Sequence, residues 1–352
     1  MGKDLLDNLE QRGDKTGLSR EESRALLALK EPDEMAGLLQ YADRVRRRYC
    51  GDEVHLRALL EFSNICRRQC NYCGLRSPND KLSRYRMSPD EIVATAEKLA
   101  AKGLQTIVLQ SGEDPYYTGA MLADIVRHIK QATGLAITLS VGERPYADYQ
   151  LWREAGADRY LLRHETANPE HYRFLHPDSA FEERRRCTQW LRELGYQVGI
   201  GCMVGSPGQT IEHLVDDIEF IQSFQPDMVG IGPFIPHPNT PLGDYPAGEL
   251  QMILKMVALA RIVTKDALIP ATTAVGTIDE LGRELALEAG ADVVMPNYTP
   301  PAYRTRYEIY PNKRCVTENP QLCDGCLRLR IMSVGRTVAA GPGHSRKRGG
   351  LG

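Results

Sequence analysis

The sequence predicts an α/β fold, a closed (β/α)8 barrel of the TIM type with helices before it and a short extension after it. Eight short apolar or β-branched runs alternate with longer helical patterns between residues 54 and 300, and several of those patterns end in a glycine suited to a left-handed cap. Polar or glycine-rich residues recur directly after the runs, where such a barrel builds its active site. A doubly wound open sheet is the competing architecture, and the count of eight favours the barrel.

The expected elements follow one another in alternation along the chain. Strands are expected at residues 56–62, 106–110, 136–140, 159–162, 197–202, 228–231, 268–272 and 293–295. Helices are expected at residues 89–102, 120–132, 149–155, 181–194, 211–224, 248–264 and 279–289. We therefore assign residues 54–300 to the barrel, residues 1–53 to an N-terminal helical cap and residues 301–352 to a C-terminal extension.

The N-terminal region has the pattern of a helical pair. Ser19 is followed three residues later by Glu22, which is the spacing of a capping box at a helix start. A second amphipathic helix is expected over residues 34–49. Nothing in this region has the spacing of a ligand set, so we expect it to cap one end of the barrel.

Composition excludes several functional classes. The chain has 352 residues, a net charge of −2 and 42% hydrophobic residues, which is typical of a soluble globular protein without the basic excess that binds nucleic acid or a membrane surface. No signal-peptide pattern and no run of eighteen apolar residues is present, so a cytoplasmic location is expected. Nine cysteines are too few and too clustered for a disulfide scaffold, and six of them form two tight groups that indicate metal ligation.

The first cysteine group follows the first expected strand. Cys66, Cys70 and Cys73 have the spacing C-x3-C-x2-C, which lets three thiolates converge on one centre. A structural zinc site would need a fourth protein ligand, and the loop offers none. A 4Fe-4S cluster is favoured because thiolates are its ligands and three of them leave one iron open. Three structural thiols or a zinc knuckle are the alternatives.

With Tyr72 before the last cysteine and Gly74 after it, this loop resembles the cluster motif of radical S-adenosylmethionine (SAM) enzymes. The resemblance implies that the open iron binds SAM and that one electron splits it into methionine and a 5'-deoxyadenosyl radical. Within this superfamily the chain resembles the HydE maturases of FeFe-hydrogenase. The matching stretches include EFSNICRRQCNYCGLR (61–76), RYLLRHETANP (159–169), MVGSPGQT (203–210), DMVGIGPFIPHPNTPL (227–242) and VVMPNYTPPAYR (293–304).

The resemblance also implies roles for residues at the strand ends. SAM would be bound by residues that match its contacts in the family, namely Ser111, Gly112, Glu113, Glu165, Arg184 and Met228. A deeper substrate cavity would be lined by Thr138, Arg163, Thr272, Thr273, Met295 and Tyr307. Without the resemblance, the acids would be read as a solvated turn and Arg184 as a charge on a helix face. His164, the neighbour of Arg163 and Glu165, is expected to point outward as a structural histidine.

The second cysteine group follows the barrel. Cys315, Cys323 and Cys326 have the spacing C-x7-C-x2-C. The resemblance to HydE proteins implies that this triplet can hold an auxiliary cluster of the 2Fe-2S type, which is not uniformly needed for activity. A zinc site completed by an external ligand and a triplet without function are the alternatives. The basic segment 344–350 is expected to be disordered.

The function implied by the resemblance is assembly of the diiron subcluster of FeFe-hydrogenase. The substrate would be an iron-cysteine precursor with CO and CN ligands, supplied by a partner maturase, and the other hydrogenase maturases would be partners. Ferredoxin or flavodoxin would donate the electron, with no nucleic acid and no membrane involved. Two alternatives are a radical SAM amino-acid mutase like methylornithine synthase and a non-catalytic iron-sulfur scaffold or sensor.

Overall fold

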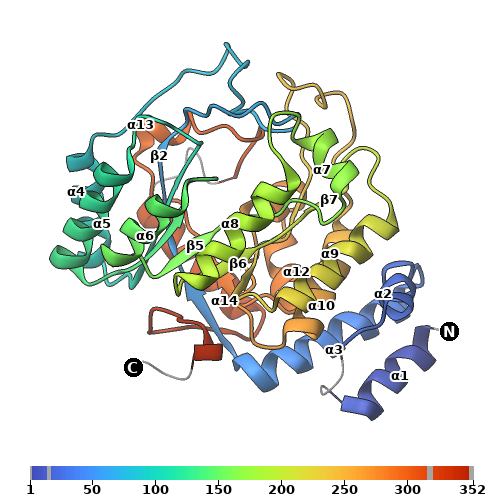
Figure 1. Cartoon of the computed structure of the whole chain (residues 1–352). Coiled ribbons are helices and arrows are strands. Elements are labelled where there is room, and N and C mark those ends of the chain that lie inside the picture. The colour runs from blue at the N-terminus through green and yellow to red at the C-terminus, as the bar shows by residue number, and fades with distance from the viewer. Residues whose placement is uncertain (1, 14–16, 315–319, 349–352) are drawn as a thin grey trace.

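The computed structural model describes residues 2–13, 17–314 and 320–348. Its centre is a parallel sheet of six strands that neighbour one another in chain order (Figure 1). These strands are β2 (Ala58–Ser63), β3 (Thr106–Ser111), β4 (Ala136–Ser140), β5 (Arg159–Leu161), β6 (Gln197–Ile200) and β8 (Met228–Val229). All five pairings are parallel, which requires a crossover after each strand and explains the strand-helix alternation.

Two further positions close the sheet into a barrel. Met228 bridges to Leu268, and Pro270 bridges to Val293, both in parallel. The last position, β10 (Val293–Val294), pairs with β1 (Glu53–Leu56), and Leu59 of β2 bridges to Asn297. The predicted closed barrel is therefore confirmed, although the expected strand at 268–272 forms only single bridges. Two short strands, β7 (Met203–Val204) and β9 (Gly232–Pro233), pair beyond the ends of β6 and β8.

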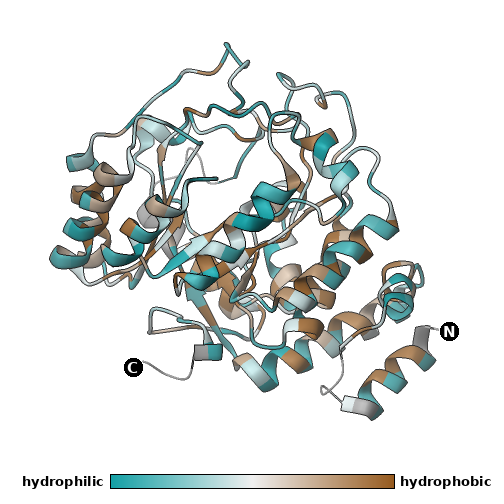
Figure 2. Ribbon diagram, in the orientation of Figure 1, coloured by the Kyte–Doolittle hydropathy of each residue, from teal (hydrophilic) through white to brown (hydrophobic). Residues whose placement is uncertain are grey.

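Helices surround the barrel, with hydrophobic residues toward the strands and hydrophilic residues outside (Figure 2). The expected helices are α4 (Pro89–Ala101), α5 (Gly119–Thr133), α6 (Tyr146–Glu154), α8 (Phe181–Glu193), α9 (Ile211–Phe224), α10 (Leu250–Thr264) and α12 (Gly282–Glu288). Three short helices were not expected, namely α7 (Pro169–Leu175), α11 (Thr273–Ile278) and α13 (Pro301–Arg304). Side-chain caps start several of them; Ser88, Thr118 and Thr210 each accept a backbone N–H of the first turn.

The N-terminal region contains three helices, α1 (Gly2–Arg12), α2 (Arg20–Leu27) and α3 (Pro32–Cys50). The predicted capping box at Ser19 and Glu22 is present, and the helix expected at 34–49 is confirmed within α3. Helix α2 packs against α9, where Arg20 forms an ion pair of 3.0 Å with Glu212. This region covers the outside of the barrel and contributes nothing to the cavity described below.

The C-terminal extension contains α14 (Pro320–Ser333), β11 (Thr337–Val338) and the 3-10 turn η2 (Arg346–Arg348). The prediction of disorder at 344–350 is wrong for residues 344–348. Arg159, at the start of β5, donates to the carbonyl oxygens of Pro342 (2.8 Å) and Gly343 (3.0 Å), and Arg57 donates to Gly343 (3.1 Å). Buried guanidinium groups need acceptors, and this tail supplies them at the N-terminal end of the barrel.

No helix among the described residues is long and apolar enough to cross a membrane.

Candidate functional site

A cavity of about 320 Å³ lies at the C-terminal ends of the strands. It brings together predicted residues from five of the eight strand ends, from helix α8 and from the extension. Its walls include Cys66, Cys70, Cys73, Ser111, Gly112, Glu113, Arg163, Glu165, Arg184, Thr272, Thr273, Met295 and Tyr307. The cysteine loop therefore shares one enclosure with most of the residues expected to bind SAM and substrate.

The cysteine loop is held in place by the residues after β3. Gly112 lies so close to the loop that a Cβ atom there would sit 2.3 Å from the Ile65 carbonyl oxygen and 2.7 Å from the Cys66 Cβ. Only glycine permits this approach. Beside it, the backbone N–H groups of Arg68 and Glu113 both point at the Cys66 sulfur at 3.4 Å. Amide groups directed at a sulfur favour its thiolate form.

The three thiols suit a multi-iron cluster better than a single ion. Among the described residues, the only set of three ligand atoms within 4.8 Å of one another belongs to His164, Cys202 and Asp217, so the loop sulfurs are too far apart to share one zinc ion. None of the loop thiols is in a disulfide. Burial, and then the neighbouring Cys66 thiol, raises the pKa of Cys73 to about 12. Binding to iron removes this penalty because the metal carries the compensating charge.

Glu113 uses its side chain to support the cysteine loop. Its carboxylate accepts hydrogen bonds from Arg68 (2.6 Å), from Arg67 (3.1 Å) and from the backbone N–H of Glu143 (2.8 Å). With its side chain 6% exposed, Glu113 has little free acceptor capacity. Its carboxylate therefore anchors the cysteine loop.

Arg184 projects from α8 into the cavity and is held by Glu143, a residue that the sequence interpretation did not select. The Arg184 Nε lies 2.8 Å from Glu143 Oε1, and Arg184 also donates to the Tyr172 hydroxyl at 3.2 Å. Although burial opposes it, the Glu143 carboxylate raises the pKa of Arg184 well above its usual value. Glu143 also binds Arg68, so one buried carboxylate links the predicted SAM arginine to the cysteine loop. The prediction that Arg184 is only a helix-face charge is excluded by this burial.

Arg163 and Glu165 face the cavity from the end of β5. The Arg163 guanidinium lies 2.9 Å from the Glu165 carboxylate and donates to the Cys202 carbonyl oxygen at 2.7 Å. Glu165 has a φ of 64°, in the left-handed region that non-glycine residues rarely adopt. The pair places one cation and one anion in the cavity that the cysteine loop also lines.

Two predicted residues lie in a lower chamber of about 20 Å³ rather than beside the cysteine loop. Thr138 and Met228 line this chamber with Arg57, and the Arg57 guanidinium lies 2.7 Å from the Met228 sulfur. Thr138 was expected at depth. Met228 was expected at the adenine of SAM, and its placement near the barrel floor does not fit that role, because β8 carries it one layer below the strand ends.

The C-terminal segment adds Lys313 to the cavity, beside Glu61 of β2, and the sequence interpretation missed both groups. Lys313 forms an ion pair with Glu61, and both side chains are buried. Asn297 donates to the other Glu61 oxygen at 2.8 Å. Tyr307 accepts from Gln110 at 3.2 Å and lies under the Lys313 ammonium. A buried charge needs such a partner, but the sequence separation of 252 positions gives no signal of the pairing.

His176 is a third group that sequence interpretation missed. Its Nδ1 lies 3.3 Å from the Cys70 sulfur and its Nε2 lies 3.4 Å from the Tyr72 hydroxyl. Burial lowers its pKa well below the usual value, so the ring is neutral and has one donor for these two partners. His176 is not part of any metal-ligand motif in the sequence, so its contact with Cys70 could not be predicted. It directly follows α7.

The predicted auxiliary site is only partly described. Cys315 lies outside the described residues, as does the side chain of Cys323, and Cys326 is exposed on α14. The three lone cysteines, Cys50, Cys187 and Cys202, are buried and free.

Comparison with known proteins agrees with this geometry. Residues 60–221 match the family model of the radical SAM superfamily. The chain is 52% identical to the FeFe-hydrogenase maturase subunit HydE of Thermotoga maritima, over 95% of each chain. The chain belongs to the HydE family of radical SAM enzymes. The family uses a 4Fe-4S cluster and SAM, and the three loop thiols, Gly112 and the Arg184 wall fit these two groups.

More distant relatives of this HydE-family chain share the barrel. It is 34% identical to 3-methylornithine synthase of Methanosarcina acetivorans over 79% of each chain. The crystal structure of methylornithine synthase (PylB) superimposes with a TM-score of 0.82 at 27% identity, over 96% of this chain and 97% of that one. The maturase HydG from Carboxydothermus hydrogenoformans gives a TM-score of 0.79 at 23% identity, over 95% and 78%, which supports the fold alone.

Proposed function

We propose that this chain helps to build the diiron subcluster of FeFe-hydrogenase by acting on an iron-cysteine precursor that carries CO and CN ligands. The observation that carries the proposal is the cysteine loop at the mouth of a cavity whose deeper wall holds Arg163, Thr272 and Thr273, in a chain 52% identical to a HydE maturase. Such a cavity suits a small, polar, anionic substrate better than a protein segment.

Each group of the chain has a separate task in this proposal. Cys66, Cys70 and Cys73 hold the cluster, whose chemistry is to supply the electron that cleaves SAM. The backbone at Ser111 and Gly112 receives the methionyl end of SAM, because no side chain blocks its approach there. Arg184 holds the SAM carboxylate through its fork of N–H groups, and Glu165 accepts from the polar groups of SAM.

The lower part of the cavity binds the substrate. Arg163 Nε is buried without a hydrogen-bond partner among the described residues, so it can serve a substrate acceptor. The Thr138 hydroxyl also has no such partner, but it faces the small chamber below this cavity. Thr272 and Thr273 stand at the start of α11, where Arg283 fixes the Thr273 hydroxyl at 3.1 Å. Met295 and Tyr307 complete the enclosure, which excludes water from a reactive radical.

We extend the proposal to the surroundings of the enzyme. A partner maturase delivers the precursor, the other hydrogenase maturases share the pathway, and ferredoxin or flavodoxin supplies the electron in the cytoplasm. Cys315, Cys323 and Cys326 bind an auxiliary 2Fe-2S cluster. Met228 lines the lower chamber and is not part of the proposed SAM site.

The test is anaerobic in vitro maturation of FeFe-hydrogenase with the other maturases present. Cys73→Ala should abolish both hydrogenase activation and formation of 5'-deoxyadenosine, because the cluster loses a ligand. The matched control is Cys187→Ala, a buried cysteine outside the cavity, which should retain both activities. Full activation by the Cys73→Ala protein would overturn the proposal.

The second candidate is an amino-acid mutase, favoured by the likeness to methylornithine synthase across nearly the whole chain. Incubation with lysine, SAM and reductant would then yield a rearranged isomer. The third candidate, an iron-sulfur scaffold or sensor, predicts no 5'-deoxyadenosine from the wild-type protein. Product chromatography separates all three.

A further inference from the structure

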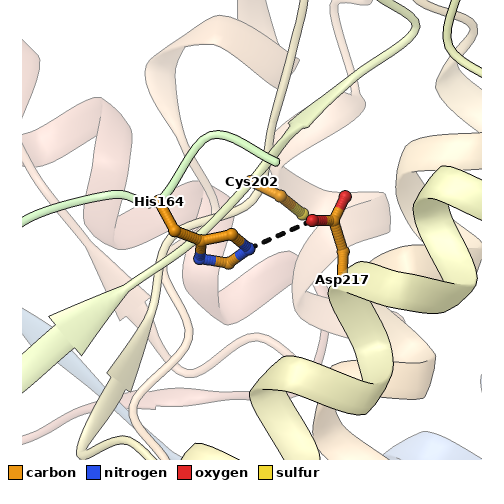
Figure 3. A group of neighbouring side chains, drawn as sticks. All are labelled: His164, Cys202 and Asp217. Carbon is orange, nitrogen blue, oxygen red and sulfur yellow. Dashed lines mark hydrogen bonds and ion pairs between the residues drawn. The ribbon is translucent and has the colours of Figure 1, made fainter. Parts of the chain in front are cut away.

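Behind the cavity wall lies a buried cluster of His164, Cys202 and Asp217 (Figure 3). His164 follows β5, Cys202 lies between β6 and β7, and Asp217 points at them from α9. The exposed fractions of the three residues are 2%, 0% and 0%. These side chains take no part in the cavity, so a buried carboxylate here needs an explanation.

The hydrogen bonds around His164 define its tautomer. The backbone N–H of Gly201 donates to Nδ1 at 3.2 Å, so Nδ1 is unprotonated and Nε2 carries the proton. Nε2 then donates to the Asp217 Oδ1 at 3.2 Å. A metal ion would need the Nε2 lone pair, which this tautomer does not offer. The cluster is therefore better suited to hold chain segments together than to hold an ion.

Asp217 secures both ends of the turn that contains Glu165. The same oxygen that accepts from His164 also accepts the backbone N–H of Ala167 at 2.5 Å. Between these two anchors, Glu165 has a φ of 64°. A left-handed conformation at a residue with a Cβ is costly, and it persists only where the surroundings hold it.

The backbone of Glu165 is also tied to the strand on the other side. Its N–H donates to the Gly201 carbonyl oxygen at 3.0 Å, and its carbonyl oxygen accepts from Met203 at 2.9 Å. His164 and Glu165 point to opposite faces of this segment, His164 toward α9 and Glu165 toward the cavity. A change in the position of His164 would therefore also change the orientation of the Glu165 side chain.

We propose that His164 and Asp217 are positioning residues that hold the left-handed turn at Glu165 and so aim its carboxylate at SAM. The SAM half of this statement rests on the proposed function, whereas the holding of the turn does not. Asp217 acts through the hydrogen bonds that Oδ1 accepts, because no donor among the described residues reaches Oδ2.

The test compares three substitutions on α9. Asp217→Leu removes the acceptor at similar volume, whereas Asp217→Asn keeps an oxygen that accepts from His164 and Ala167. Ile218→Val is the matched control, because it removes one buried methyl group from the same helix without touching the turn. Iron content of the reconstituted protein checks that each variant carries its cluster.

The first measurement is hydrogen-deuterium exchange of the segment 163–169 in cluster-free protein, which needs no SAM. Exchange should rise about tenfold in Asp217→Leu and stay within about threefold of wild type in Asp217→Asn and Ile218→Val. The second is the KM for SAM in 5'-deoxyadenosine formation, which should rise about tenfold only in Asp217→Leu, while the iron content stays unchanged.

Each other outcome overturns part of the argument. Equal effects of Asp217→Leu and Ile218→Val on exchange and KM would mean that Asp217 only contributes to general stability. Wild-type protein without its iron-sulfur cluster could contain one equivalent of zinc that Asp217→Leu lacks. That result would mean that His164, Cys202 and Asp217 bind a metal ion. A wild-type protein that forms no 5'-deoxyadenosine would sink the proposed function, and the exchange measurement would still decide whether Asp217 holds the turn.

Discussion

The two ends of the barrel both bury arginines, but they neutralise them in opposite ways. At the C-terminal end, Arg68 and Arg184 meet the carboxylate of Glu143, which raises the pKa of Arg184 against the effect of burial. At the N-terminal end, no carboxylate among the described residues forms an ion pair with Arg57 or Arg159. They donate to backbone carbonyl oxygens of the tail and contact neutral side chains such as Met228 and Gln197. Burial there lowers the pKa of Arg159 to about 10 and that of Arg57 well below its usual value.

The difference separates a binding end from a sealing end. The ion pair with Glu143 leaves N–H groups of the Arg184 guanidinium that an incoming carboxylate can accept from. The positive charge is therefore already fixed in the cavity before a ligand binds. At the N-terminal end the tail carbonyls accept from both arginines, so part of their donor capacity is already used within the chain. Four predictions test this contrast, from the largest expected effect to the smallest.

Removal of Glu143 should have the largest effect. Glu143→Leu leaves the buried Arg184 guanidinium without its carboxylate partner, while Arg68 keeps only Glu113. Breaking a buried pair costs about 3–5 kcal/mol of unfolding free energy. Urea denaturation of the cluster-free protein measures the change. Glu183→Leu, which removes an exposed partner of Arg186 on α8, is the control and should cost less than about 1 kcal/mol. Equal losses of unfolding free energy in Glu143→Leu and Glu183→Leu would mean that the buried carboxylate contributes no more to stability than an exposed one.

Removal of the tail should have a smaller effect. A chain cut after Gly341 loses the carbonyl acceptors of Arg57 and Arg159 and should lose about 1–3 kcal/mol of unfolding free energy, because water can reach the opened end and replace them. A chain cut after Arg348 keeps those acceptors and serves as the control. If the cut after Gly341 lowered the unfolding free energy more than Glu143→Leu does, burial of arginines at the N-terminal end would contribute more to stability than the ion pairs at the C-terminal end.

The N-terminal end should also be sensitive to acid through His55. Burial lowers the pKa of His55 to about 4 from an ordinary 6.5, so between these values the unfolded chain binds a proton that the folded chain does not. Stability is therefore lost as the pH falls from 6.5 to 4. His55→Gln should reduce this loss by on the order of 2 kcal/mol in urea titrations at several pH values. A variant as acid-sensitive as wild type would contradict the prediction.

Lys347 should have the smallest effect. It donates to the Pro226 carbonyl oxygen at 2.8 Å and lies 3.6 Å from Asp266, but its side chain is 21% exposed. Lys347→Ala should cost about 0.5 kcal/mol, measured by urea denaturation. A loss above about 2 kcal/mol would show that side chains of the tail, and not only its carbonyl groups, seal the barrel.

Much of the fold could be predicted because its signals are local. Helix α9 begins and ends where its periodicity and its Thr210 cap place it, and α8 differs from prediction by one residue. The strand at 268–272 was located, but it forms only single bridges. That reduction depends on how the neighbouring strands diverge, and a short stretch of sequence carries no information about their spacing. The order of the tail was missed because its charge resembles that of a disordered segment, while its partners lie in strands about 200 positions away.

The candidate site shows the same limit. Motif spacing was enough to select Cys66, Cys70 and Cys73, and the resemblance brought in Glu165 and Arg184. Glu143 follows the third expected strand, but its role could not be predicted, because that role comes from two arginines that reach it from other elements. Met228 was misplaced because a match along the chain does not say at which height of the barrel a residue sits.

The tail that closes the N-terminal end also has a consequence for biosynthesis. A ribosome makes the cysteine loop early and residues 342–348 about 270 positions later. Domains fold as the chain emerges, so the loop and its supporting strands can form while the floor of the barrel is still open. We expect a nascent chain stalled before Pro342 to hold a largely formed barrel whose Arg57 and Arg159 face water, so that synthesis of residues 342–348 would complete the enclosure.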